Sequence, residues 1–182
     1  PTWDLACQLQ GEMFETVAKT GGLDVQLIYF RGFGECRASR WVSDARALAG
    51  LMTGIECRGG HTQMSKVFSH ARNEHNSKKI NAVVYVGDAM EEDIDKLAQK
   101  AGELGLLGCP MFLFQEGHDP VAQTAFKEFA RLTKGAYARF NAGAAAELAA
   151  LLRAVAAYAS GGRAALKLQQ GGSAKLLLEQ LS

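Results

Sequence analysis

The chain has 182 residues, and its 20 lysines and arginines are balanced by 19 acidic residues to a formal net charge of +1. A hydrophobic share of 48% argues against a disordered chain, and the balanced charge argues against nucleic-acid binding that depends on net charge. The length favours one domain with a short tail, and four isolated cysteines favour free thiols over a disulfide framework. Pro1 leads into a polar amphipathic stretch rather than a signal peptide, so we expect a cytoplasmic protein that does not span a membrane.

The first third of the chain predicts helices on either side of a β-hairpin. Apolar residues at a four-residue step indicate a helix over residues 3–18, which a pair of glycines ends. A strand over residues 23–30 follows, and residues 36–41 return antiparallel to it after a glycine-rich turn. Ser43 suits the cap of a short helix. Thr62 opens another helix, which turns four apolar side chains inward: Met64, Val67, Phe68 and Ala71.

The rest of the chain alternates strands with helices. Residues 80–86 form the clearest strand, and their nearly continuous apolar run predicts burial on both faces. The remaining elements, in chain order, are a helix at 91–104, a strand at 111–114, a helix from Pro120 to Gly135, a strand at 136–140 and a helix at 144–159.

This alternation predicts an α/β fold with three layers, like a Rossmann fold. Helices would cover both faces of a mostly parallel central sheet, and the return strand at 36–41 would form one antiparallel edge. We expect the main domain to cover residues 1–160. Residues 161–182 would form a helical extension, set off by one glycine pair at 161–162 and broken by another at 171–172.

Polar segments follow three of the predicted extended stretches. In open α/β sheets ligands bind beyond the carboxyl ends of the strands, so we expect these segments to share one rim. An oxygen-rich rim suits a hard cation such as Mg²⁺. The alternative is that the acidic side chains complement helix dipoles, and that Asp88 is a helix cap. The side chains that this arrangement brings together are Thr62, Asp88, Glu91, Glu92, Asp93, Glu116, His118 and Asp119.

At these segments the sequence resembles the von Willebrand factor A-type (VWA) domain family. The loop GGHTQ at 59–63 leads into a helix, as the family's GGT loop does. The stretch INAVVYVGDAMEED at 80–93 resembles the family's strand that ends in a loop with an aspartate. The stretch FKEFARLTKGAYARF at 126–140 resembles its unit of helix, glycine turn and aromatic strand. The resemblance covers residues 1–160 and implies the family's Rossmann-like fold.

The resemblance also implies a cation site of the kind that binds Mg²⁺ or Mn²⁺. In the family three loops hold the cation; Thr62 matches the threonine of the second loop, and Asp88 matches the aspartate of the third. The family's first strand and its D-x-S-x-S loop have no counterpart in these residues, so the implied site is partial. The sequence departs further from the family pattern at Gly87 and Ala89, which flank Asp88. Further rim contacts would come from Gly60, His61, Glu91, Glu116, His118 and Asp119.

Three functions remain open. The first is a non-enzymatic protein-protein interaction module, in which a rim cation binds a carboxylate of an unknown protein partner. The second is a metal-free scaffold of the same fold, and the third is a small hydrolase or transferase that uses the acidic rim. The sequence leaves a homo-oligomer open, and does not favour nucleic acid or membrane as partner.

Other patterns have simpler interpretations. Cys57 and His61 are spaced for zinc, but no second ligand pair is visible. Cys109 and His118 suggest a catalytic pair only if the fold brings them together. The arginines around the predicted hairpin are more typical of a solvated sheet edge than of a nucleic-acid site.

Overall fold

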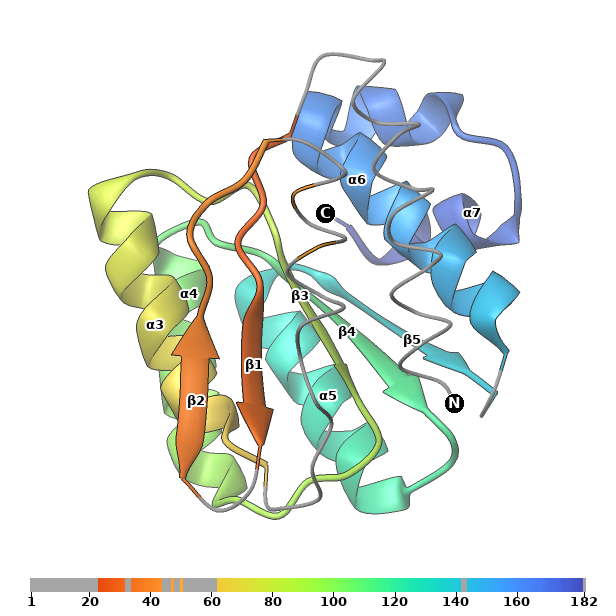
Figure 1. Ribbon diagram of the computed structural model, residues 1–182. Helices are drawn as coiled ribbons and strands as arrows, with labels where there is room; N and C mark the ends of the chain where they lie inside the picture. Colours follow the sequence, from red (N-terminus) through yellow and green to blue (C-terminus); the bar gives the residue numbers. More distant parts are fainter. Residues whose placement is uncertain are drawn as a thin grey trace.

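Two β-sheets and the helices around them make up the described part of the chain (Figure 1). The computed structural model describes residues 23–31, 34–43, 47, 50, 62–141 and 144–181. The helix predicted at 3–18 and most of the short helix after Ser43 lie outside these residues. The small sheet is an antiparallel pair of β1 (Ile28–Arg31) and β2 (Glu35–Ala38). The larger sheet is parallel in the order β3-β4-β5, with bounds Val83–Gly87, Met111–Glu116 and Ala136–Phe140.

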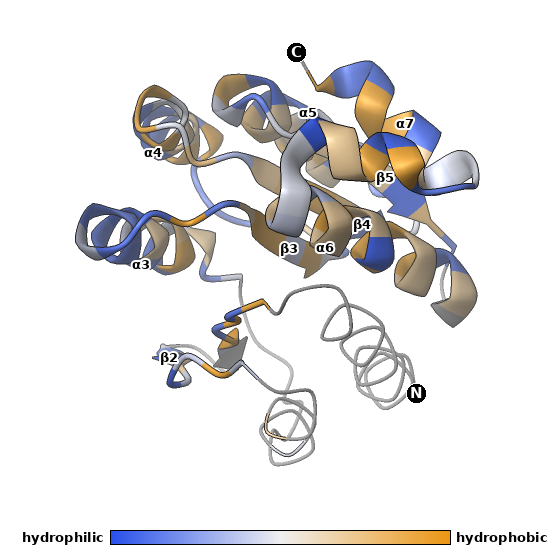
Figure 2. Cartoon of the chain, turned by 90° about the horizontal axis from the view of Figure 1, so that it is seen from above, coloured by the Kyte–Doolittle hydropathy of each residue, from blue (hydrophilic) through white to orange (hydrophobic). Residues whose placement is uncertain are grey.

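Helices cover both faces of the parallel sheet, which confirms the predicted α/β fold with its layered arrangement. The connection from β3 to β4 is α4, and the connection from β4 to β5 is α5. The two helices pack against each other and α4 packs against α3, while α6 and α7 lie on the other side (Figures 1 and 2). None of the described helices is long and apolar enough to cross a membrane. The helices are α3 (Met64–Ser77), α4 (Ile94–Leu106), α5 (Pro120–Thr133), α6 (Ala145–Leu168) and α7 (Gly172–Gln180).

The parallel sheet separates two hydrophobic cores. Successive side chains of a strand point to opposite faces, so Met111 of β4 packs with α3, α4 and α5, whereas Phe112 packs with α6 and α7. Both side chains are fully buried. Leu27 and Ile28, at the start of the hairpin, divide between the same two cores. The hairpin therefore lies at the level of the same central layer. Among the described strands, however, it forms a sheet of its own, whereas the prediction made it the antiparallel edge of a single sheet.

The central strand β4 and the helix α3 follow the sequence pattern closely. The four residues predicted to face inward on α3 are all buried, because they recur at the spacing of one helical face. Pro120 stands in the first turn of α5 as predicted. The predicted break at Gly161 and Gly162 is also confirmed, since both residues leave helical geometry and kink α6.

The prediction that β3 is buried on both faces is wrong. Val84 and Val86 are 37% and 39% exposed, although the apolar run that contains them is nearly continuous. The reason is that β3 pairs only with β4 among the described strands, so it forms an edge of its sheet. The strand also begins at Val83 rather than at Ile80, whose N–H donates to Nδ1 of His75 at 3.0 Å.

Candidate functional site

The carboxyl ends of β3 and β4 place two predicted site residues side by side. Gly87 is paired in register with Gln115, so Asp88, the residue after β3, lies at the level of Glu116, the last residue of β4. His118 and Asp119 follow on the loop that leads into α5. The segments that follow β3 and β4 therefore begin at the same edge of the sheet. Gly60, His61 and Cys57 lie outside the described residues.

Glu92 joins this rim to the start of α3. Its Oε2 accepts the N–H of Met64 at 2.7 Å, and its Oε1 accepts the N–H of Ser65 at 3.1 Å. Gln63, at the cap position of α3, makes no side-chain capping bond, so Glu92 supplies the cap from a distant loop. Its negative charge also complements the positive end of the α3 dipole. The alternative that Glu92 complements a helix dipole therefore holds for the start of α3, which lies 28 residues away in the sequence.

Thr62, just before α3, contacts two acidic side chains of the loop between β3 and α4. Its N–H donates to Oε2 of Glu91 at 3.0 Å, and its hydroxyl donates to Oε2 of Glu92 at 3.0 Å. A hydroxyl that donates its proton keeps its lone pairs as acceptors. The Thr62 oxygen therefore remains chemically able to bind a cation while Glu92 holds its orientation.

Asp88 differs from the other acidic groups of the rim. It is exposed, and it makes no hydrogen bond or ion pair within the described part of the chain. The alternative that Asp88 caps α4 is wrong, because Asp93 does so by accepting the N–H groups of Asp95 and Lys96. Asp119 likewise caps α5 through the N–H of Ala122. Asp88 is thus a carboxylate at a strand end that no described residue binds.

The rim carboxylates also act on a buried neighbour, Tyr85. Tyr85 of β3 is 6% exposed and packs edge-to-face on Phe126. Burial raises the pKa of the Tyr85 phenol well above its ordinary value, and the carboxylates of Glu92, Asp88 and Glu91 raise it further. The rim therefore carries a negative potential that would attract a cation or a basic group.

The oxygen atoms at the rim are of the type that a hard cation prefers, but the described residues offer too few of them to hold one. Thr62 and Asp88 offer a hydroxyl and a carboxylate, which are oxygen ligands of the type that Mg²⁺ prefers. Within the described ranges, however, no three His, Cys, Asp or Glu side chains are grouped so that they could hold a metal ion. Both oxygens of Glu92 already accept protein hydrogen bonds. Water, a partner or further residues of the chain would have to supply the missing ligands.

Gln115 is a rim residue that sequence reasoning missed. Its side chain is fully buried at the end of β4, where its Nε2 donates to the carbonyl of Asp119 at 2.8 Å. The hydroxyl of Tyr137 on β5 donates to its Oε1 at 2.7 Å. Gln115 therefore connects the loop before α5 to β4 and β5. The signal in the sequence was a single polar residue that continues a run of buried apolar ones.

The fold does not bring Cys109 and His118 together, so they do not form the catalytic pair that was already improbable from the sequence. Cys109 precedes β4 and His118 follows it, so they lie at opposite ends of a six-residue strand. Such a strand is about 20 Å long. Burial also raises the pKa of the Cys109 thiol to about 11, which keeps it protonated and poorly nucleophilic at neutral pH.

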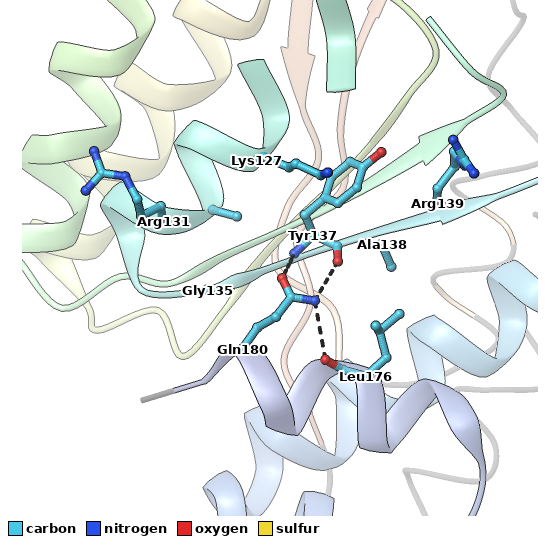
Figure 3. Close-up of a pocket in the computed structure, with 9 residues that line it drawn as sticks. Lys127, Arg131, Gly135, Tyr137, Ala138, Arg139, Leu176 and Gln180 are labelled. Atoms are coloured by element: carbon cyan, nitrogen blue, oxygen red, sulfur yellow. Dashed lines mark hydrogen bonds between the residues drawn. The ribbon is translucent and has the colours of Figure 1, made fainter. Parts of the chain in front are cut away.

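A second surface feature lies at the other edge of the parallel sheet (Figure 3). An open groove of about 500 Å³ runs between α5, β5 and α7, and sequence reasoning did not identify it. Lys127 lies with its Nζ 5.5 Å from the centre of the Tyr137 ring, and Arg131 pairs with Glu128 at 2.5 Å. Two of the positively charged side chains that line the groove therefore already interact with neighbouring residues.

Comparison of the chain with protein-family models and with curated proteins found no match. The resemblance to the VWA family thus stays a prediction from motif order.

Proposed function

We propose that the protein is a non-enzymatic protein-protein interaction module of the VWA type, whose partner binds at the rim where β3 and β4 end. The observation that carries this proposal is the exposed carboxylate of Asp88, which no capping role among the described residues explains; the same loop holds Glu92, whose carboxylate orients the hydroxyl of Thr62. The negative potential at Tyr85 supports it, because it draws cations and basic groups to the same place.

In the metal-dependent form of this proposal, Thr62 and Asp88 contribute to a site for Mg²⁺ or Mn²⁺. A bound divalent cation would keep a coordination position for an oxygen ligand from outside the site. A carboxylate of the partner protein would take that position and bind by charge as well as by coordination. Glu91, Glu116 and His118 would contact the partner around it.

Isothermal titration with Mg²⁺ and Mn²⁺ tests the metal-dependent form. We expect saturable binding by the wild-type protein and a loss of at least about tenfold in affinity for Asp88→Asn, which keeps the shape but removes the charge. Glu179→Gln is the matched control, because Glu179 is an exposed acidic residue on α7, away from the rim. Equal binding by all three proteins, or none by the wild type, would contradict the role of Asp88.

A metal-free scaffold is the second candidate, and one observation favours it. Glu92, Asp93 and Asp119 each accept backbone N–H groups at helix starts, so much of the acidic rim has a structural role. In that case the partner would bind the rim through basic groups. A complex with a purified partner that survives EDTA, yet is lost on charge reversal by Asp88→Lys, would select this candidate. The hydrolase or transferase receives less support, because the cap of α5 occupies the carboxylate of Asp119.

A further inference from the structure

We propose that the groove between α5, β5 and α7 binds a small organic anion, whose carboxylate or phosphate group is held at Arg139 and whose apolar body lies on the floor of the groove (Figure 3). This inference concerns the sheet edge away from β3 and does not depend on the function proposed for the rim. It rests on two positive charges that no described carboxylate neutralises, on an open backbone N–H, and on the size and lining of the groove.

The groove carries positive charge that its surroundings do not compensate. Three cationic side chains line it, and no acidic side chain of the described residues does so. Arg131 is bound by both carboxylate oxygens of Glu128, at 2.9 and 2.5 Å. Lys127 lies over the ring of Tyr137, a contact that leaves its ammonium charge unpaired. Arg139 is exposed, and its side chain makes no hydrogen bond or ion pair with a described residue. Two formal positive charges therefore remain for an anion.

The backbone of β5 adds a hydrogen-bond donor at Arg139. The N–H of Tyr137 donates to Oε1 of Gln180 at 2.8 Å, and Nε2 of Gln180 donates to the carbonyl of Tyr137 at 2.8 Å, so these backbone groups point away from β4 (Figure 3). Directions alternate along a strand, and the N–H of Arg139, two residues further on, therefore points the same way. Within the described ranges no acceptor binds it. The N–H and the guanidinium of one residue can thus bind two oxygens of an anionic group.

The groove also has the size and lining of a small-molecule site. Its volume of about 500 Å³ lies within the range of about 300–1,000 Å³ that such sites occupy. Apolar atoms of Ala130, Ala138 and Leu176 line it. Leu176 is 42% exposed, so a ligand would still find apolar surface to cover. This lining favours an anion with an apolar body over an inorganic ion.

The described chain does not supply the anion itself. After α7 the chain leads into the core on the α6 side of the sheet, where Leu181 is buried and its carbonyl accepts a hydrogen bond from the guanidinium of Arg163. The residues that adjoin β5 and α7 in the sequence but lie outside the described ranges, 142–143 and Ser182, carry no acidic side chain. An anion from solution therefore fits the groove better than a neighbouring segment of the chain.

An NMR titration with phenylpropionate tests this proposal. The probe joins a carboxylate to an apolar body; phenylpropanol has the body without the charge, and inorganic phosphate has the charge without the body. We expect saturable shifts of the amide signals of Tyr137, Ala138 and Arg139 with the probe, and at least about tenfold weaker binding of either control. Phenyl phosphate is titrated in parallel, and the tighter of the two organic anions identifies the anionic group.

Charge-removing variants give an independent arm. We expect Arg139→Gln to weaken the binding of phenylpropionate by at least about tenfold, because the guanidinium binds the carboxylate directly. Lys127→Gln should weaken it by about threefold, because the ammonium contributes mainly through its charge. Lys96→Gln is the matched control, since Lys96 is an exposed lysine of α4, no residue of which lines the groove, and it should bind the probe as the wild type does.

Four outcomes would overturn the proposal. One is that phenylpropionate causes no saturable shift at these amides. Another is that phenylpropanol or inorganic phosphate binds as tightly as the probe, which would mean an apolar surface or a general attraction of charge. The third is an unchanged affinity in Arg139→Gln. The fourth is an Arg139 amide that exchanges with solvent as slowly as that of Ala138 in the protein alone, which would mean that the chain itself already fills the groove.

Discussion

Removal of the Glu92 carboxylate should destabilise the protein well beyond the effect of an ordinary surface residue. In Glu92→Ala the N–H groups of Met64 and Ser65 lose their acceptor, and the Thr62 hydroxyl loses its partner. Loss of a helix cap costs about 1 kcal/mol, and loss of a hydrogen bond to a charged group adds about as much or more. We therefore expect a decrease of about 2 kcal/mol in the free energy of unfolding.

Urea denaturation followed by circular dichroism measures this decrease. We expect a lower midpoint with an unchanged m-value, and a fall of about 4–8 °C in Tm for a chain of this size. Glu179→Ala is the control, since Glu179 is an exposed acidic residue with no role in a cap, and it should stay within about 0.5 kcal/mol of the wild type. A change for Glu92→Ala no larger than that of the control would refute the assignment of Glu92 as the cap of α3.

Three further predictions concern the packing and the edges. Gly135→Ala should lower the free energy of unfolding by more than about 3 kcal/mol, because the new Cβ would lie 1.8 Å from the carbonyl oxygen of Met111. Its control, Gly102→Ala in α4, has open space around the new Cβ and should raise that free energy by about 0.5–1 kcal/mol. Thermal or urea unfolding measures both changes. The side chain of Gln180 accepts the N–H of Tyr137 at the outer edge of β5. Gln180→Ala should therefore speed hydrogen exchange at the Tyr137 amide, while Gln170→Ala leaves it unchanged. Equal exchange rates in the two variants would contradict this protection of the edge by Gln180. Because the pKa of Tyr85 is raised in the folded state, the unfolded protein loses the phenol proton first, so the free energy of unfolding should fall as pH rises above about 10; a slope unaltered in Tyr85→Phe would refute this.

Elements with a strong local pattern were predictable from the sequence. The inward face of α3 follows from the 3.6-residue period, and β4 follows from a short apolar run after Pro110. In both cases the spacing of the apolar side chains, which the fold buries, is enough to predict the type of element. The kink at Gly161 and Gly162 follows from their conformational freedom, since Gly162 has a φ of 66°.

Features that depend on distant partners were not predictable. The apolar run of β3 indicates a strand but not how many neighbours the strand has, and for that reason the exposure of Val84 and Val86 was missed. Glu92 is 28 residues from Met64, so its capping bond could not be read from local spacing. The same limit applies to Gln115, whose two partners come from a loop and from β5.

The paramagnetic effect of Mn²⁺ on the amide resonances of the protein tests the proposed function most directly. Nuclear spins close to a bound Mn²⁺ lose their signals first, so the cation is located without any knowledge of the partner. The proposal predicts that the signals of Thr62 and Asp88 broaden at the lowest Mn²⁺ concentrations, and that Asp88→Asn abolishes this selectivity. Uniform broadening, or selective broadening at residues remote from the ends of β3 and β4, would contradict the proposed cation site.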